Sequence, residues 1–216
     1  MLLLVRHGQS VWNASDRFAG CTDITLTDEG REEARALGRW LADAGHQPTR
    51  VYTSALRRAI ETADLALAAA GAPDVRAVRT PVLDERHYGA LQGVARTAAV
   101  RQYGAEQVAR WRRTVDARPP LDAEGRAESL ADVRERVAPF VRDVLLPAAA
   151  AGQQVMVVSH GNTMRMLSQL VEGLSDEEAC ALELPTGQPR ICRQPTRPTV
   201  SGTKTSSSAV RLARMP

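Results

Sequence analysis

Two His-Gly pairs in this chain each follow a short apolar run. The first contains His7 and comes after an apolar run at residues 2–5 and one arginine; the second contains His160 and comes after an apolar run at residues 155–158 and one serine. An amide residue and then a hydroxyl residue follow each pair. A neutral imidazole is a competent nucleophile or proton acceptor near pH 7. The repeated pattern therefore indicates two imidazoles that act in one site.

Strand-like runs alternate with helical patterns along the chain. This alternation predicts an α/β fold, a three-layer sandwich whose mostly parallel central sheet has helices on both faces. The strand-like runs lie at residues 2–5, 50–53, 75–79 and 154–159. The helical patterns lie between a cap at Thr27 and a stop at Gly45, at 55–70 with Ser54 as the cap, at 98–114, at 130–151, and from about His160 to Leu170.

Both histidines fall where a predicted strand ends and a helix begins. In parallel α/β sheets, ligands bind outside the carboxyl ends of the strands, and the next helix offers free N–H groups to an anion. Gly8 and Gly161 are expected to allow a tight turn at each junction. A single histidine in such a place is more often a loop or core residue. The matched pair favours one anion-binding crevice.

Length and composition point to one domain without a membrane span. The 216 residues are 44% hydrophobic and 25% charged, with a net charge of +3. No apolar run reaches the roughly 20 residues of a membrane helix, and the first run is too short for a signal peptide. We expect a cytoplasmic protein with no membrane partner.

Arginine dominates the positive charge, since Lys204 is the only lysine. Arginine is the better bidentate partner for phosphate, although base composition alone can also favour it. The sequence has no basic run with interleaved aromatic residues, so it gives little support for nucleic-acid binding. The three cysteines show no metal-type spacing, so neither a disulfide framework nor a metal site is expected.

Longer motifs carry a resemblance to a known family. The segments "FAGCTDITLTDEG", "YTSALRRAIETA", "LDERHYGALQG", "WRR" and "VVSHGNTMR" resemble, in order and spacing, the 2,3-bisphosphoglycerate-dependent phosphoglycerate mutases of the histidine phosphatase superfamily. The resemblance implies a catalytic domain over residues 1–189 and interconversion of 3- and 2-phosphoglycerate in glycolysis and gluconeogenesis through a phosphohistidine. It also implies 2,3-bisphosphoglycerate as the priming phosphoryl donor, no metal, and a homodimer or homotetramer.

The same resemblance assigns the phosphoryl chemistry to residues around the two histidines. It implies that His7 attacks phosphorus and carries the phosphoryl group. It implies that Arg6 and Arg58 bind the phosphoryl oxygens and that His160 is a further donor in the same pocket. Arg57, beside Arg58, is expected to form only a surface ion pair, because successive helix positions face apart.

A carboxyl group is needed to protonate the leaving oxygen. Residue types alone do not separate Glu85 from its neighbour Asp84, and only the family motif selects Glu85. A mutase must also grip the carboxylate of its substrate, a demand that Arg112 and Arg113 would meet. The substrate contacts that the resemblance implies are Gly8, Gln9, Ser10, Asn13, Ala19, Gly20, Thr22, Arg86, Tyr88, Arg96, Arg112, Arg113, Gly161 and Asn162.

Three features depart from the family pattern. Arg96 replaces a lysine that the family usually has, and only residues 121–127 stand where the family often has a long segment near the mouth of the site. After Pro189 the chain is rich in Ser, Thr, Pro and Arg without strand or helix period, which predicts a disordered tail at 190–216. A frameshift relative to an ancestral sequence is one hypothesis for this tail.

Two other functions stay open at this point. A broad-specificity phosphatase would use the same phosphohistidine and transfer its phosphoryl group to water; the short segment at 121–127 favours it slightly. A phospho-ligand binding relative without activity is disfavoured because every candidate catalytic residue is present.

Overall fold

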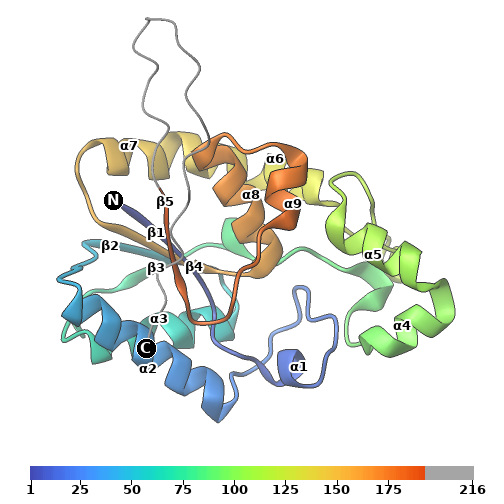
Figure 1. The fold of residues 1–216 in the computed structure, drawn as a ribbon, viewed down its shortest axis with the longest axis horizontal. Coiled ribbons are helices and arrows are strands. Elements are labelled where there is room, and N and C mark those ends of the chain that lie inside the picture. Colours follow the sequence, from blue (N-terminus) through green and yellow to red (C-terminus); the bar gives the residue numbers. More distant parts are fainter. Residues whose placement is uncertain (193–216) are drawn as a thin grey trace, which may run out of the picture.

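A five-stranded sheet forms the centre of the computed structural model, which describes residues 1–192 (Figure 1). The strand order is β3-β2-β4-β1-β5; β5 is antiparallel to β1 and the other pairs are parallel. This arrangement confirms the predicted α/β class with a mostly parallel sheet. The strands are β1 (Leu2–Arg6), β2 (Arg50–Thr53), β3 (Ala77–Arg79), β4 (Val155–Ser159) and β5 (Pro189–Cys192).

Helices cover both faces of the sheet, and α4 and α5 lie to one side of it (Figure 1). The α-helices are α1 (Val11–Ala14), α2 (Asp28–Asp43), α3 (Arg57–Ala69), α4 (Arg96–Tyr103), α5 (Ala105–Arg113), α6 (Leu130–Phe140), α7 (Leu146–Ala150), α8 (Gly161–Glu172) and α9 (Asp176–Ala181). Short 3₁₀ helices lie at Pro81–Leu83 and Gly89–Leu91, and a π-helical segment, Val141–Leu145, joins α6 to α7.

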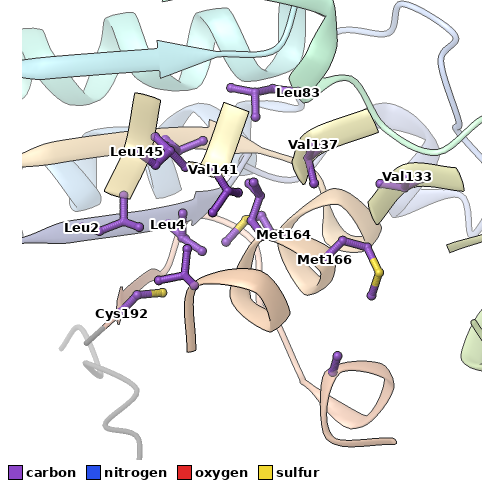
Figure 2. Close-up of a cluster of buried hydrophobic side chains, with 14 of the residues drawn as sticks. Leu2, Leu4, Leu83, Val133, Val137, Val141, Leu145, Met164, Met166 and Cys192 are labelled. Carbon is purple, nitrogen blue, oxygen red and sulfur yellow. The ribbon is translucent and has the colours of Figure 1, made fainter. Parts of the chain in front are cut away.

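Alternating side chains of the strands form two separate cores, as the two-residue period of a strand requires. In β1, Leu3 and Val5 pack with residues of α2 and α3, whereas Leu2 and Leu4 pack with residues of α6 and α8. Figure 2 shows the second cluster, in which Met164 of α8 lies close to Leu4. Because both faces are buried, β1 and β4 read as continuous apolar runs rather than as alternating ones.

Two predicted helix boundaries are wrong. The pattern at 98–114 is two helices, because Gly104 adopts a φ of 84° between α4 and α5 and ends the first of them. Ser54 does not cap α3: the helix begins at Arg57 with Leu56 as its N-cap, which makes no side-chain cap bond. The cap at Thr27 is confirmed, since its side chain accepts a hydrogen bond from the amide of Gly30.

The prediction that no strand follows Pro189 is also wrong, because Pro189–Cys192 forms β5 along β1. This strand carries a buried ion pair, with 2.6 Å between Nη2 of Arg190 and Oε2 of Glu172 on α8. A tertiary partner of this kind leaves no local periodic signal. The remainder of the predicted tail, residues 193–216, lies outside the described residues. Among residues 1–192, no helix is long and apolar enough to cross a membrane.

Candidate active site

The two His-Gly pairs meet at the carboxyl ends of neighbouring strands. Arg6 of β1 is in register with Ser159 of β4, and the amide of His7 donates to the carbonyl of Ser159 at 2.9 Å. The imidazole rings of His7 and His160 follow directly, with 4.9 Å between their centroids. Both side chains are buried. The sheet register therefore brings the two histidines together, as the repeated pattern predicts.

The hydrogen bonds of His7 fix which ring nitrogen carries the proton. Nδ1 lies 2.6 Å from the carbonyl oxygen of Gly8, which can only accept, so the proton is on Nδ1. Nε2 then carries the lone pair, which accepts a hydrogen bond from Nε of Arg58 at 3.3 Å. Burial, then the charges of Arg58 and Arg6, lower the pKa of His7 well below its usual value of 6.5. The imidazole is consequently neutral near pH 7 and can act as a nucleophile.

Backbone carbonyls hold the Arg58 guanidinium beside His7. Its Nη1 donates to the carbonyl of Thr22 and its Nη2 to the carbonyl of Gly20, both at 2.8 Å. Neither bond neutralises the charge, and burial lowers the pKa of Arg58. Arg6 is similar, since its Nη1 donates to the carbonyl of Leu184 at 2.9 Å. These two poorly hydrated guanidinium groups can therefore bind the oxygens of a phosphoryl group.

The structure separates the adjacent carboxyl groups of Asp84 and Glu85. Glu85 lines the same pocket as His7, and its Oε1 accepts from the amide of Arg86 at 2.8 Å. Asp84 does not line that pocket; its Oδ1 accepts from the amide of Ala55 at 2.8 Å. Burial raises the pKa of Asp84, and this amide opposes the rise. Of the two neighbouring carboxyl groups, only that of Glu85 lines the pocket in front of His7.

The pocket in front of His7 is strongly cationic. Seven arginines and two glutamates contribute to its lining, which suits a ligand with several anionic groups. Among the residues that the structure describes, no group of three or more His, Cys, Asp or Glu residues could hold a metal ion. The predicted site residues that line the pocket are Arg6, His7, Asn13, Ala19, Gly20, Arg58, Glu85, Tyr88, Arg96, Arg112, Arg113, Gly161 and Asn162.

The outer arginines of the pocket differ in their partners. Arg96 forms an ion pair with Asp16. Arg113 donates from Nη2 to Oε1 of Glu183 at 3.0 Å and from Nη1 to the carbonyl of Cys180 at 2.9 Å. For Arg112, no carboxylate lies within ion-pair distance among residues 1–192, and burial lowers its pKa. Arg112 is therefore the outer arginine best prepared to take a ligand anion.

Four predicted site residues support the loops around the pocket without lining it. Ser10 caps α1, and its hydroxyl accepts from the amide of Asn13. The Gln9 amide donates to Oε2 of Glu33 at 2.7 Å. Thr22 contributes only its carbonyl, as an acceptor for Arg58. The Gly8 amide donates to the hydroxyl of Thr62 at 3.0 Å.

The prediction that Gly8 and Gly161 allow tight turns is wrong. Neither Gly8 nor Gly161 has a positive φ, so neither serves a tight left-handed turn. A Cβ on Gly8 would lie 2.2 Å from the carbonyl oxygen of Gly30, so Gly8 permits close packing of the loop against α2. A Cβ on Gly161 would lie 3.6 Å from Nη1 of Arg165, at the pocket wall.

Two further predicted residues lie behind the pocket wall. His160 is fully buried, and its Nε2 is 2.7 Å from the hydroxyl of Ser54. Arg86 is fully buried with its guanidinium 4.3 Å from the centroid of the Tyr88 ring. Burial favours the neutral form of Tyr88, but the charge of Arg86 and a hydrogen bond from Asn162 outweigh it and lower the pKa of this phenol.

Sequence reasoning missed several lining residues, of which Arg165 is the most informative. It lies four positions after Gly161 on α8, one helical turn away and on the same face. This spacing from Gly161 could have predicted that Arg165 lies at the pocket. Arg165 Nη2 donates to the carbonyl of Leu182 at 3.1 Å, and burial lowers its pKa. The other residues missed are Arg17, Phe18, Glu183 and Leu184. None of the lining residues comes from the short segment 121–127.

The two buried neutral histidines make stability depend on pH. Burial, then Arg58, also lowers the pKa of His160 well below 6.5. The unfolded chain binds protons at His7 and His160 near pH 6.5, whereas the folded protein binds them only at lower pH. The free energy of unfolding should therefore fall as pH drops below 6.5, by about 1.4 kcal/mol per pH unit for each histidine until its folded pKa is reached. Urea unfolding measured over this range checks the slope.

A His7→Asn variant should show a flatter slope in the same measurement. His46→Asn is the matched control, because His46 packs against Trp40 far from the pocket. An unchanged slope in His7→Asn would mean that His7 titrates alike in the folded and unfolded states, and would contradict its burial as a neutral ring.

Comparison with known proteins agrees with this geometry. The family profile of the histidine phosphatase superfamily (branch 1) matches residues 2–195. The chain is 42% identical over 208 residues to the 2,3-bisphosphoglycerate-dependent phosphoglycerate mutase of Corynebacterium glutamicum, covering 88% of this chain and 84% of that one. It is 41% identical over 212 residues to the enzyme of the same name from Histophilus somni, covering 89% and 93%.

Solved structures with the same fold include phosphatases. A mycobacterial glucosyl-3-phosphoglycerate phosphatase superposes with a TM-score of 0.75 at 27% identity, covering 88% of this chain and 90% of that one. A protein described as mycobacterial hydrolase 1 also has a TM-score of 0.75, at 26% identity. With the paired histidines, the carboxyl group and the arginine-lined pocket in place, the chain belongs to the histidine phosphatase superfamily and, by its relatives, to the 2,3-bisphosphoglycerate-dependent phosphoglycerate mutases within it.

Proposed function

We propose that this protein interconverts 3-phosphoglycerate and 2-phosphoglycerate through a phosphohistidine on His7. The observation that carries the proposal is the unprotonated Nε2 of His7, which accepts a hydrogen bond from Arg58 in a pocket that continues outward to Arg112 and Arg113. A phosphatase pocket needs to bind only the group that it removes. The outer arginines can hold the carboxylate and the second oxygen position of a phosphoglycerate as well.

The transfer requires one nucleophile and one proton donor. Nε2 of His7 attacks phosphorus, the bond from phosphorus to the substrate oxygen breaks, and the proton of Glu85 goes to that oxygen. In the opposite step the free hydroxyl of a bound phosphoglycerate attacks the phosphohistidine, the bond from phosphorus to Nε2 breaks, and the hydroxyl proton goes to the Glu85 carboxylate, so that 2,3-bisphosphoglycerate is the bound intermediate. Arg6 and Arg58 stabilise the charge on the moving phosphoryl group, and His160 packs against the His7 ring from behind the pocket wall.

The proposal includes 2,3-bisphosphoglycerate as the primer that supplies the first phosphoryl group. The excess of guanidinium over carboxylate groups in the lining fits a ligand with two phosphates and a carboxylate. We further propose a cytoplasmic enzyme of glycolysis and gluconeogenesis, in which a homodimer or homotetramer takes phosphoglycerates as substrates.

Phosphatase activity is the second candidate, and one feature favours it. Glu183 accepts a hydrogen bond from the Arg113 guanidinium. It also adds a negative charge at the outer pocket, where the substrate carboxylate would bind. Transfer of the phosphoryl group from His7 to water would need only the inner part of the site. The folds of the phosphatase structures described above are compatible with this alternative.

Changing Arg112 to alanine tests the choice between the two. Each charge-assisted hydrogen bond lost is worth on the order of 1.5–3 kcal/mol, roughly ten- to a hundred-fold in binding. Arg112→Ala should therefore reduce mutase activity by about that factor and leave hydrolysis of a small phosphate ester without a carboxylate nearly unchanged. Arg113→Ala should cost less, because Glu183 competes for that guanidinium.

The ratio of the two activities is the quantity to measure, since loss of folded protein cancels from it. Arg110→Ala is the control, an exposed arginine on the same helix. A parallel fall of both activities in Arg112→Ala would assign Arg112 to the phosphoryl pocket or to the fold, and would support the phosphatase.

A further inference from the structure

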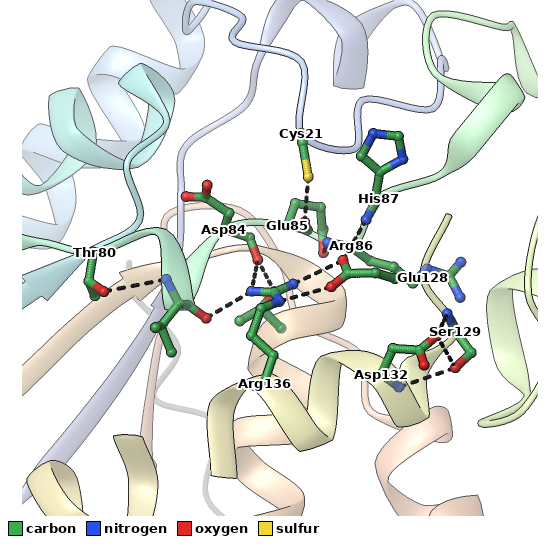
Figure 3. A network of polar contacts seen from close by, with 12 residues as sticks. Cys21, Thr80, Asp84, Glu85, Arg86, His87, Glu128, Ser129, Asp132 and Arg136 are labelled. Carbon is green, nitrogen blue, oxygen red and sulfur yellow. Dashed lines mark hydrogen bonds and ion pairs between the residues drawn. The ribbon is translucent and has the colours of Figure 1, made fainter. Parts of the chain in front are cut away.

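One ion pair from a distant part of the chain holds the backbone on both sides of Glu85 (Figure 3). Arg136 lies on α6, and its Nη1 donates to the carbonyl of Val82 at 2.8 Å and to the carbonyl of Asp84 at 3.1 Å. A single guanidinium nitrogen thus fixes the carbonyl immediately before Glu85 and another two residues earlier.

The partner of Arg136 holds the chain just after Glu85. Glu128 precedes α6, and its two carboxylate oxygens accept from Nε and Nη2 of Arg136 at 2.9 and 3.1 Å. Oε2 of Glu128 also accepts from the amide of His87 at 2.8 Å, and the Glu128 amide donates to the carbonyl of His87 at 2.9 Å. The pair therefore spans residues 82–87 with Glu85 between its two attachment points.

Two more side chains complete the support of this segment. The Cys21 thiol donates to the carbonyl of Glu85 itself at 3.0 Å, and the hydroxyl of Thr163 donates to the carbonyl of Asp84 at 2.6 Å. Burial raises the pKa of Cys21 to about 12, so the thiol stays protonated and able to donate. The carbonyls of Asp84 and Glu85 are consequently each held by a side chain from outside this segment.

We propose that Glu128 and Arg136 are positioning residues that fix the Glu85 carboxyl group for proton transfer. The inference rests on the proposed role of Glu85 as the proton donor. Each side chain of the pair is only 23% exposed, so water and salt weaken it less than they weaken a surface ion pair. Neither residue lines the pocket in front of His7. Their hydrogen bonds reach the site through the backbone of residues 82–87.

A misplaced proton donor has a distinctive kinetic signature. Departure of a phosphoglycerate oxygen as an alkoxide needs a proton, whereas 4-nitrophenolate is a stable anion that leaves without one. Displacement of a catalytic group by about 1 Å can cost on the order of 10²-fold in rate. Loss of the ion pair should therefore slow the first reaction and largely spare the second.

The experiment compares Arg136→Lys with the unaltered protein on two substrates. Lysine keeps the charge but cannot bind Glu128 through two nitrogens and reach both carbonyls. We expect kcat for phosphoglycerate to fall about 10- to 100-fold with little change in KM. The first-turnover rate of 4-nitrophenolate release from 4-nitrophenyl phosphate, which precedes hydrolysis of the phosphohistidine, should change by less than about threefold, because that step bypasses the proton donor. Glu128→Gln should reproduce this pattern, and it provides the same test if Arg136→Lys fails to fold.

Arg134→Lys is the matched control, because Arg134 lies on the same helix and pairs with Asp176 at 2.8 Å away from Glu85. It should leave both rates unchanged. The double variant Glu85→Gln with Arg136→Lys should be no slower than Glu85→Gln alone, since the pair acts only through the carboxyl group. Equal losses on both substrates, or additive losses in the double variant, would overturn the positioning role. If Glu85→Gln itself slows both substrates equally, the proposed role of Glu85 fails first.

Discussion

Replacing His7 by alanine is expected to abolish both mutase turnover and hydrolysis of any phosphate ester. Both reactions pass through the same phosphoryl transfer to Nε2, and no other described side chain of the pocket presents a neutral, unprotonated imidazole nitrogen toward it. Loss of a nucleophile lowers kcat by on the order of 10⁴-fold or more. Steady-state assays of 2-phosphoglycerate formation and of 4-nitrophenolate release measure the two activities on the same preparation.

The same variant tests where the phosphoryl group resides. Incubation of the unaltered protein with 2,3-bisphosphoglycerate should give an acid-labile, base-stable adduct on His7, which His7→Ala should lack. His46→Ala should retain both the adduct and the activity. Recovery of the adduct on His160 would reverse the roles given to the two histidines, since His160 is the only other imidazole within ring contact of His7 among residues 1–192.

The second large effect is expected for Glu85→Gln, which should lower kcat by about 10²–10⁴-fold, the usual contribution of a general acid or base. Glutamine keeps the shape of the side chain and can still accept from the Arg86 amide, but it has no proton to exchange with the substrate oxygen. The loss should be smaller for an ester whose leaving group departs as a stable anion.

Asp84→Asn is the control for this prediction. Asp84 bonds the amide of Ala55 and does not reach the pocket, so its replacement should affect stability, by about 1 kcal/mol, more than kcat. Equal losses of kcat in Glu85→Gln and Asp84→Asn would show that the carboxyl group facing the substrate has been wrongly assigned.

The parts of the structure that follow from local patterns could be predicted from the sequence. Continuous apolar runs mark β1 and β4 because both faces of the sheet are covered, and Thr27 marks the start of α2 because its hydroxyl satisfies a free amide. Two such strands with His-Gly at their ends were enough to predict the meeting of His7 and His160.

Features set by tertiary partners were not predictable in the same way. Ser54 looks like a helix cap, but its hydroxyl is engaged by His160, 106 residues away. The composition of the chain after Pro189 suggests no regular structure, although β5 lies there. The burial of Arg190 in this strand depends on its ion pair with Glu172 of α8. Only the fold reveals such pairings.

The site shows the same division between local and tertiary signals. The motif selected Glu85 over Asp84, and the pocket agrees because only Glu85 lines it. The ion pair of Arg57 with Asp23 is confirmed at 3.3 Å, with both side chains exposed. The ion pair between Arg113 and Glu183 was not predicted, because no local sequence pattern indicates a contact between residues 70 positions apart.

The central claim is mutase chemistry primed by 2,3-bisphosphoglycerate, and one assay tests it most directly. Formation of 2-phosphoglycerate from 3-phosphoglycerate should be followed by a coupled reaction, with and without added 2,3-bisphosphoglycerate, while free phosphate is measured in the same samples. We predict that 2-phosphoglycerate formation depends on the primer and exceeds the release of phosphate by a wide margin. Release of phosphate without formation of 2-phosphoglycerate, whether or not the primer is present, would contradict the account and identify the protein as a phosphatase.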